Sequence, residues 1–386
     1  GRHPNFTRVY KPYSWRYFAF NLKCLYYLGL WPGEELSKRR LLFYKIYAMI
    51  LHGMPINFII LTAIGTYENR KDMIVLMSNL DKTLVAYNFV LKTFFFVLRR
   101  KQLSLLITEI KQSGDSISKA RERLMAIHVI VVTTLSTATV GAFSLLSLLK
   151  GELPVEAWVP FNETKNQLNL FLGLQILANS FLVCLFRNFA IQGIVCSIVM
   201  YFCDQLTEVQ IRIKTLKFLK QNELAIREEF KNIVKKHVRL MRYSRSFTNI
   251  FKEFFLIQNL AVTVELCLNA IMVTVGMAEK TLLASFIAYL CLALLNAYIF
   301  CYLGNELIIQ SQGIALAAYE SEWTSWPIDM QKDLLVVIRM AQKPLSLSAG
   351  GMTTMCIQTY SQVTIGPATY NKQYTLKNVA LRLMHV

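Results

Sequence analysis

Charged residues are scarce in this 386-residue chain. Asp, Glu, Lys and Arg make up only 17% of it, against 54% hydrophobic residues. Soluble globular domains usually carry about 25% charged residues. The apolar residues also come in long blocks. The composition therefore excludes one large soluble core and favours a protein that crosses a membrane several times.

The motifs of the common enzyme classes are missing. The sequence has no P-loop, no nucleophile elbow, no HExxH zinc motif and no GxGxxG fingerprint after a strand. His52 and His128 stand alone in apolar stretches, where a histidine is more often a hydrogen-bonded packing residue than a catalyst. We therefore expect neither an enzyme nor a bound cofactor or metal.

Cysteine patterns that signal disulfides or metal sites are missing as well. No CxxC pair and no His/Cys spacing of a metal site occurs. A disulfide framework would place its cysteines in segments that face an oxidising compartment, and none lies in a loop that we expect outside. We expect buried thiols in helices for all eight: Cys24, Cys184, Cys196, Cys203, Cys267, Cys291, Cys301 and Cys356.

Long hydrophobic blocks are what the chain does have. A helix that rises 1.5 Å per residue needs about 20 residues to cross a roughly 30 Å hydrocarbon core. The first six blocks reach this length, and the seventh, rich in Ser, Gly and Thr, suits a closely packed or pore-lining helix. The sequence predicts an all-α membrane protein with seven transmembrane helices at 41–66, 72–98, 124–149, 168–202, 253–276, 281–308 and 345–370.

Positive charge is distributed unequally between these blocks. The chain has a net charge of +18, and 30 of its 42 Lys and Arg residues fall in the segments 1–40, 99–123, 203–252 and 309–344. Cytoplasmic loops are the Lys/Arg-rich ones. We therefore expect an inverted topology, with the N-terminus cytoplasmic and the C-terminus extracellular. Anionic lipid headgroups explain these basic segments, so we expect the lipid bilayer and no nucleic acid as a partner.

This topology divides the chain into six parts. No signal peptide is visible in the basic arm, so the first span is expected to act as its own insertion signal. Leu206, Val209, Ile213, Leu216 and Leu219 predict one amphipathic helix over 204–250. The parts are the arm 1–40 with an interfacial aromatic segment, spans one to four at 41–202, a cytoplasmic anchor segment at 203–252, spans five and six at 253–308, a second anchor segment at 309–344, and the seventh span with a tail at 345–386.

Several polar features interrupt the spans and the outer loop. Charges in a membrane usually face the protein interior or water, so we expect the second span, which carries Asp81, Lys82 and Lys92, not to face lipid all round. In the loop 150–167, Trp158 and Phe161 are expected to fold back as a lid. The sequon at Asn162 is expected to be outside and glycosylated, and the one at Asn5 to be cytoplasmic and bare.

One stretch resembles a known family. It reads Tyr302-Leu303-Gly304-Asn305-Glu306-Leu307, then Ala317-Ala318-Tyr319, Trp323, and Pro344-Leu345-Ser346-Leu347-Ser348-Ala349-Gly350. These elements, in this order, are similar to those of the insect odorant receptor family, seven-helix cation channels opened by odorants. The resemblance implies four subunits around a pore lined by helix seven, in the plasma membrane of sensory-neuron dendrites. The short interval 203–252 indicates a tuning subunit that assembles with the longer coreceptor.

The resemblance also implies a pocket for a small, neutral, volatile and largely apolar odorant in the outer half of helices two to six. Thr137, Ser144 and Tyr289 would be its polar groups. Tyr370, Gln373 and Leu376 fall where the family's pore gate lies. The expected ligand-binding residues are Met77, Leu80, Leu84, Thr137, Gly141, Phe143, Ser144, Leu145, Phe171, Leu174, Ala178, Phe286 and Tyr289.

Three other classes of membrane protein are alternatives to an odorant receptor. A gustatory receptor of the same superfamily is an alternative, because Thr369-Tyr370 with Gln373-Tyr374 partly echoes its last-helix signature. A G-protein-coupled receptor disagrees with the basic-residue distribution and would carry DRY and NPxxY motifs. A transporter would show internal repeats, and none is visible.

Overall fold

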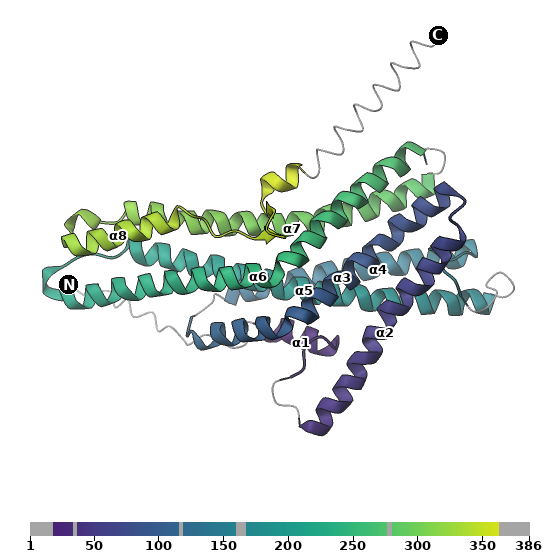
Figure 1. The fold of residues 1–386 in the computed structure, drawn as a ribbon, viewed down its shortest axis with the longest axis horizontal. Coiled ribbons are helices and arrows are strands. Elements are labelled where there is room, and N and C mark those ends of the chain that lie inside the picture. The colour runs from purple at the N-terminus through teal and green to yellow at the C-terminus, as the bar shows by residue number, and fades with distance from the viewer. Residues whose placement is uncertain (1–17, 34–36, 116–118, 160–166, 276–279, 363–386) are drawn as a thin grey trace, which may run out of the picture.

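The chain folds as an elongated bundle of long helices in a computed structural model (Figure 1). The structure describes residues 18–33, 37–115, 119–159, 167–275 and 280–362. Its helices are α1 (Ala19–Tyr27), α2 (Lys38–Glu68), α3 (Met73–Gln112), α4 (Lys119–Lys150), α5 (Gln167–Lys214), α6 (Glu223–Val275), α7 (Lys280–Tyr319) and α8 (Ile328–Ala341). The 3₁₀ turns are η1 (Lys220–Asn222) and η2 (Trp323–Ser325), and the strands are β1 (Ser348–Ala349) and β2 (Thr353–Thr354). The expected helical fold is confirmed, while the number and orientation of the crossings stay predictions.

Two helices within the described residues are apolar and long enough to cross a membrane by themselves. They are α2, whose most apolar window has a mean hydropathy of 1.7, and α5, with a value of 1.9. Several helices exceed the length of one crossing: α5 has 48 residues and α6 has 53. At 1.5 Å per residue they are about 70–80 Å long. Their excess length carries them into a helical bundle at one end of the molecule.

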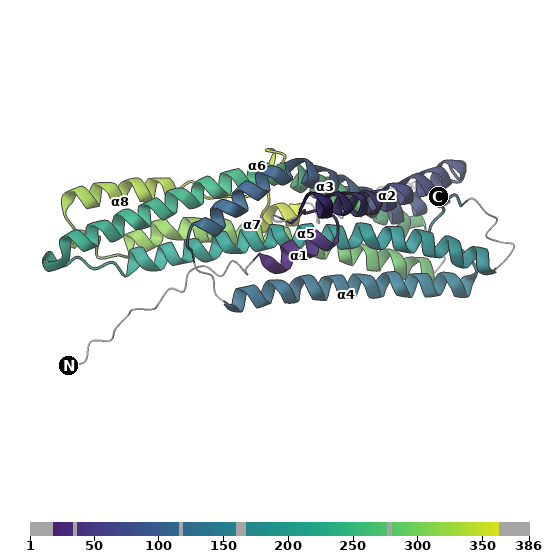
Figure 2. The same cartoon turned by 90° about the horizontal axis from the view of Figure 1, so that it is seen from below.

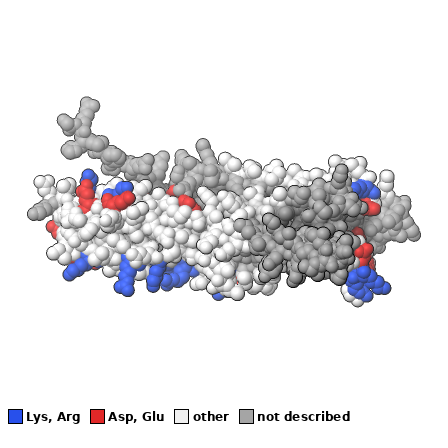
Figure 3. All heavy atoms as spheres, turned by 90° about the horizontal axis from the view of Figure 1, so that it is seen from above, with Lys and Arg blue, Asp and Glu red and all other residues white. Residues whose placement is uncertain are grey.

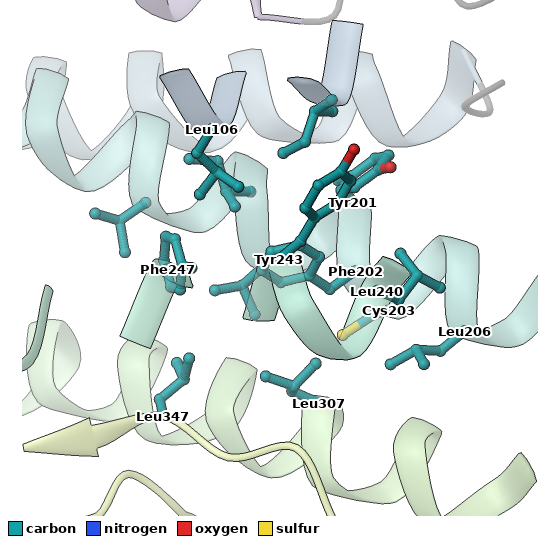
Figure 4. Packing of buried hydrophobic residues seen from close by; sticks show 14 of the residues in the cluster. Leu106, Tyr201, Phe202, Cys203, Leu206, Leu240, Tyr243, Phe247, Leu307 and Leu347 are labelled. Atoms are coloured by element: carbon teal, nitrogen blue, oxygen red, sulfur yellow. The ribbon is translucent and has the colours of Figure 1, made fainter. Parts of the chain in front are cut away.

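The main hydrophobic core lies in that end bundle, where α5, α6, α7 and α8 run side by side (Figures 1 and 2). This core contains Tyr201 and Phe202 of α5, Phe247 of α6 and Leu307 of α7 (Figure 4). The Phe202 and Phe247 rings meet edge to face at 5.7 Å between centroids. All four side chains are fully buried. The long helices are therefore fixed to one another at this end.

The aromatic arm packs on the bundle through α1. Phe18, Leu25 and Trp31 are buried in the main core. The Leu28 carbonyl accepts a hydrogen bond from Nε of Arg187 in α5 at 3.1 Å, and the Leu30 carbonyl accepts one from Arg100 of α3 at 2.9 Å. These bonds hold the arm across α3 and α5.

The segment expected to be one amphipathic helix at 204–250 is two helices instead. Leu206, Val209 and Ile213 are buried as expected, but Leu219 lies in the connection after α5 and is exposed. Because α6 packs back against α5 and α3, the chain has to reverse direction between Lys214 and Glu223. The hydrophobic pattern continues through this reversal and conceals it.

A second correction concerns the start of the expected seventh span. The structure has an antiparallel hairpin where a helix from 345 was expected, with Ser348 opposite Thr354 and Ala349 opposite Thr353. Gly350 and Gly351 have φ values of 63° and 78°, a conformation that glycine adopts readily and that tight hairpin turns need. Residues 357–362 are helical, so the small residues form a turn before that helix.

The hairpin is attached to α6 and α7 by backbone contacts. The Gly350 amide donates to the Lys252 carbonyl at 2.8 Å, and the Leu345 amide donates to Ser311 Oγ at 2.9 Å. A Cβ on Gly304 of α7 would lie 2.1 Å from the Met355 carbonyl oxygen. The glycine of the sequence motif Gly304-Asn305-Glu306-Leu307 therefore allows the chain after β2 to lie directly on α7.

On the face that Figure 3 draws, the charged side chains of the described residues gather toward the two ends of the molecule. Figure 3 shows Lys and Arg over the half that contains α8 and again at the opposite tip, with a stretch of described surface between them that shows neither sign. Such a stretch is what a helical bundle needs where lipid surrounds it.

Candidate functional site

A small apolar cavity lies between α2, α3, α4 and α5, beneath the loop 151–159. Its volume is about 60 Å³. The four helices and the loop all contribute to its wall, so it is enclosed by segments far apart in the sequence. The lining residues are Phe58, Lys82, Val140, Ser144, Pro154, Val155, Leu174, Leu177, Ala178 and Phe181.

Helical spacing explains how α5 and α4 supply most of the wall. Leu174, Leu177, Ala178 and Phe181 are three or four residues apart, so they share one face of α5. Val140 and Ser144 are likewise one turn apart on α4. Leu177 and Phe58 of α2 are buried together in a separate hydrophobic cluster, and the rings of Phe58 and Phe181 are 5.6 Å apart.

The loop above the cavity is held by its backbone. The side chain of Asn79 makes two hydrogen bonds to Glu156: its Nδ2 donates to the carbonyl at 3.0 Å, and its Oδ1 accepts from the amide at 2.9 Å. The Trp158 amide donates to the Leu61 carbonyl at 2.9 Å. A Cβ on Gly65 would lie 2.5 Å from the Glu156 carbonyl oxygen, so only glycine lets the loop approach α2 this closely.

Two polar side chains face this apolar space, Ser144 and Lys82. Lys82 is half-buried, and its electrostatic neighbours are Glu156, Asp81 and Lys150. No carboxylate in the described part of the chain forms a salt bridge with it at 4.0 Å or less. The ammonium group can therefore donate a hydrogen bond to a molecule inside the cavity.

Three of the residues expected to bind ligand line this cavity: Ser144, Leu174 and Ala178. The others that the structure describes do not. Met77, Leu80, Leu84 and Thr137 are half-buried outside it, while Gly141, Leu145 and Phe171 are exposed. The side chains of Phe143, Phe286 and Tyr289 lie outside the described set, as do Phe161, Asn162, Tyr370, Gln373 and Leu376.

Sequence reasoning missed the part of the wall that comes from α2 and the loop. Phe58 carries no local signal, because an aromatic residue in an apolar helix faces lipid as often as a cavity. Lys82 did carry a sequence signal, since a charge in an apolar span normally faces the interior. Phe181 also continues the spacing of Leu174 and Ala178 by one further turn.

A buried polar network joins α3 and α6 within the bundle. Lys92 donates to Gln258 and lies 5.1 Å from the centre of the Phe254 ring. Nδ2 of Asn269 donates to Asp81 at 2.9 Å. Asp81, Lys92 and Glu265 are 1%, 0% and 5% exposed. The burial of Asp81 and Lys92 confirms that the span carrying them does not face lipid all round. The second carboxylate oxygen of Asp81 is buried and has no hydrogen-bond partner. A buried network whose hydrogen bonds are incomplete is sensitive to rearrangement of the helices that carry it.

A second, highly charged cavity of about 620 Å³ lies in the end bundle, with Asp115 on its wall. Lys236 and Arg239 approach this carboxylate at 3.3 and 2.7 Å, and the Tyr201 hydroxyl donates to it at 2.6 Å. Burial by itself would raise the pKa of Asp115, but Lys236, Tyr201 and Arg239 together hold that pKa below its ordinary value. The carboxylate thus ties α6 to α5 and to the end of α3.

The long apolar helices and the cavity among them are typical of a helical membrane protein. The chain belongs to the 7tm odorant receptor family, whose sequence model matches residues 72–365. Residues 302–350, which carry the sequence resemblance, lie within this range.

Curated relatives are similar over a shorter stretch. Odorant receptor 30a of Drosophila melanogaster is 30% identical over 149 residues, which is 38% of each chain. The odorant receptor coreceptor of Anopheles gambiae is 25% identical over 151 residues, 39% of this chain and 32% of that protein. The alignments thus span about a third of the length of these relatives.

Solved structures agree with this chain over nearly its whole length. The insect olfactory receptor OR5 from Machilis hrabei superposes with a TM-score of 0.74 and 16% identity, covering 93% of this chain and 97% of that one. A structure of that receptor in complex with eugenol gives the same score. At this identity the agreement shows the fold.

Proposed function

We propose that this chain is the odorant-binding subunit of a ligand-gated, nonselective cation channel. Family membership supports the receptor role, and the cavity under the loop 151–159 is the single observation that carries the proposal. In the proposed assembly it joins coreceptor subunits in a heterotetramer around a pore lined by the helix that begins at 357. The assembly lies in the plasma membrane of a sensory-neuron dendrite, with an inverted topology and Asn162 glycosylated outside.

The walls of the cavity define the ligand. Aliphatic and aromatic side chains surround Ser144 and Lys82, both of which can donate a hydrogen bond. The ligand is therefore a small, neutral, mainly apolar volatile with one acceptor oxygen, such as an ester, ketone or aldehyde. The OR5–eugenol complex supports a volatile of this size as ligand for the fold.

The size of the cavity suggests how binding drives opening. Ligand pockets usually measure about 300 Å³ or more, and this cavity measures about 60 Å³. A volatile must therefore widen the space between α4, α5 and the loop. A ligand shifts a conformational equilibrium only if it binds one state better than the other. The ligand binds the widened form better, so in our proposal the widened form is the one with an open pore.

The test is voltage clamp of cells that express this chain with and without an insect coreceptor, against a panel of volatile esters, ketones, alcohols and hydrocarbons. We expect an inward cation current that requires both chains. Ala178→Phe, which fills the cavity, should abolish it, whereas Ile176→Phe, on the outer face of the same helix, should leave it intact. Equal currents from both variants would refute this pocket, and silence of the wild type at the cell surface would refute the channel.

A further inference from the structure

A third cavity, of about 320 Å³, lies between α2, α3 and α5. It shares no lining residue with the cavity beneath the loop. His52, Pro55 and Ile56 of α2 form one wall, and Val90, Thr93, Phe94 and Val97 of α3 form another. Cys184 and Arg187 of α5 form its floor. We call this space the arginine groove.

Arg187 is a buried cation without a counter-charge. Its side chain is 1% exposed. No carboxylate among the described residues forms a salt bridge with it, and its electrostatic neighbours are Cys184, Tyr44 and Tyr47, all ordinarily neutral. An ionised group removed from water without a partner destabilises the folded chain. The free energy of the fold would therefore improve if an anion entered the groove.

The hydrogen bonds of the guanidinium leave one nitrogen free. Nε donates to the Leu28 carbonyl at 3.1 Å, and Nη1 donates to Nδ1 of His52 at 3.0 Å. Nη2 is buried and has no hydrogen-bond partner. Arginine can only donate, so His52 accepts at Nδ1 and carries its proton on Nε2. Arg187 and His52 thus supply two donors to the same space.

The rest of the groove is apolar and opens toward lipid. Ile56 and Phe94, which flank the mouth between α2 and α3, are 51% and 56% exposed. In a membrane protein such side chains contact acyl chains. An occupant must therefore combine an apolar chain, entering between these residues, with a small anionic head that reaches Arg187.

We propose that the arginine groove binds one long-chain fatty acid, with its carboxylate on Arg187 and His52 and its chain along Val90, Phe94 and Val97. Guanidinium groups bind carboxylates through paired N–H donors. The carboxylate is favoured over the phosphodiester of a phospholipid because the Leu28 carbonyl and His52 already occupy two nitrogens of the Arg187 guanidinium, which leaves room for a small head group. A fatty acid would link the arm, through Leu28, to the helices that carry the odorant cavity.

The test is binding of oleate to the purified full-length chain in nanodiscs of phosphatidylcholine, followed by native mass spectrometry and by the thermal unfolding midpoint. Oleyl alcohol tests the charge, and dioleoyl phosphatidic acid tests the headgroup. We expect saturable binding of one oleate with a raised midpoint, and binding of the alcohol weaker by about tenfold or more, the size of a charge-assisted hydrogen bond. Phosphatidic acid that displaces oleate at equal concentration would overturn the fatty-acid assignment.

Variants locate the site independently of channel activity. Arg187→Gln should reduce oleate affinity to that of the alcohol. Val90→Phe fills the apolar part and keeps Arg187, so it should abolish binding of both amphiphiles even if Arg187→Gln does not fold. Leu91→Phe is the matched control and should bind oleate normally, because the Leu91 side chain is exposed and does not line the groove. Oleate binding that survives Val90→Phe would overturn the proposal.

Discussion

Lys82 is the residue that makes the proposed odorant pocket unusual, because an ammonium group faces an otherwise apolar wall. A hydrogen bond to a charged group stabilises a complex by about 1.5–3 kcal/mol. Lys82→Met keeps a long apolar side chain and removes the charge. We expect the half-maximal concentration of an ester or ketone agonist to rise about tenfold or more, while hydrocarbon agonists keep or gain potency. Dose–response curves for matched ligand pairs check this, and equal changes for both classes would contradict it.

His237 of α6 gives the end bundle a pH dependence. It is 3% exposed, and burial lowers its pKa below the ordinary value. Below the ordinary value near pH 6.5, the unfolded chain binds a proton that the folded chain does not. Stability therefore falls as the pH drops from about 7 to 5, by about 1.4 kcal/mol per unit of pKa difference.

Thermal unfolding of the purified chain at several pH values measures this effect. His237→Gln should flatten the dependence between pH 7 and 5. Asp115 does not interfere, because its pKa is lowered. Its contribution is present above the ordinary aspartate value near 4 and is lost only as the pH falls below it. A variant as pH-sensitive as the wild type would show that another group titrates.

The sequence revealed single-residue features better than shared sites. Asp81 and Lys92 could be predicted to face the interior, because the cost of a charge in lipid is a property of the residue itself. Leu174 and Ala178 could be paired from helical spacing alone. Pro154 and Phe58 could not be joined to them, because that neighbourhood arises from how the loop and α2 pack on α5.

At the scale of elements, the loop 151–159 depends on Gly65. An added Cβ would meet the Glu156 backbone at 2.5 Å, so Gly65→Ala must push the loop away from α2. We expect this overpacking to lower the free energy of unfolding by about 1–3 kcal/mol. We also expect the sensitivity to every agonist to change, because the loop that covers the cavity moves. Unfolding midpoints and dose–response curves measure the two effects.

Gly53 on the same helix is the matched control for this variant. A Cβ there meets nothing within 4 Å. Gly53→Ala should leave the agonist response unchanged and stabilise α2 by about 0.5–1 kcal/mol, the difference in helix propensity. Identical behaviour of the two alanine variants would show that the loop contact with α2 has no role in binding.

The ends of helices could be predicted where an apolar stretch gives way to a polar one. They could not be predicted where the chain turns while the apolar spacing continues. Glycines such as Gly350 and Gly351 occur both in closely packed helices and in tight turns. Their positive φ values in the structure show that here they form the turn of the hairpin. Leu216 and Leu219 likewise continue the spacing of α5 after that helix has ended. Tertiary packing sets both turns, so local propensity could not reveal them.

At the scale of the whole molecule, α8 presents apolar residues that are exposed in the part of the chain that the structure describes. Leu335 and Val336 are 63% and 61% exposed, and Ile328 is 71% exposed. Exposed apolar patches mark interaction sites, and α8 lies in the end bundle, which we propose to be the cytoplasmic anchor of the assembly. The double variant Leu335→Glu with Val336→Glu should therefore prevent assembly while each subunit stays folded.

Mass photometry of the chain purified with its coreceptor measures this outcome. The wild type should give the mass of four subunits, and the double variant mainly single subunits, with no odorant-evoked current. Lys332→Glu also changes the charge of α8 at an exposed position but removes no apolar surface, so it should assemble normally. If the double variant still forms the four-subunit species, the apolar face of α8 contacts something other than a neighbouring subunit, and the anchor must be held together by α6 and α7.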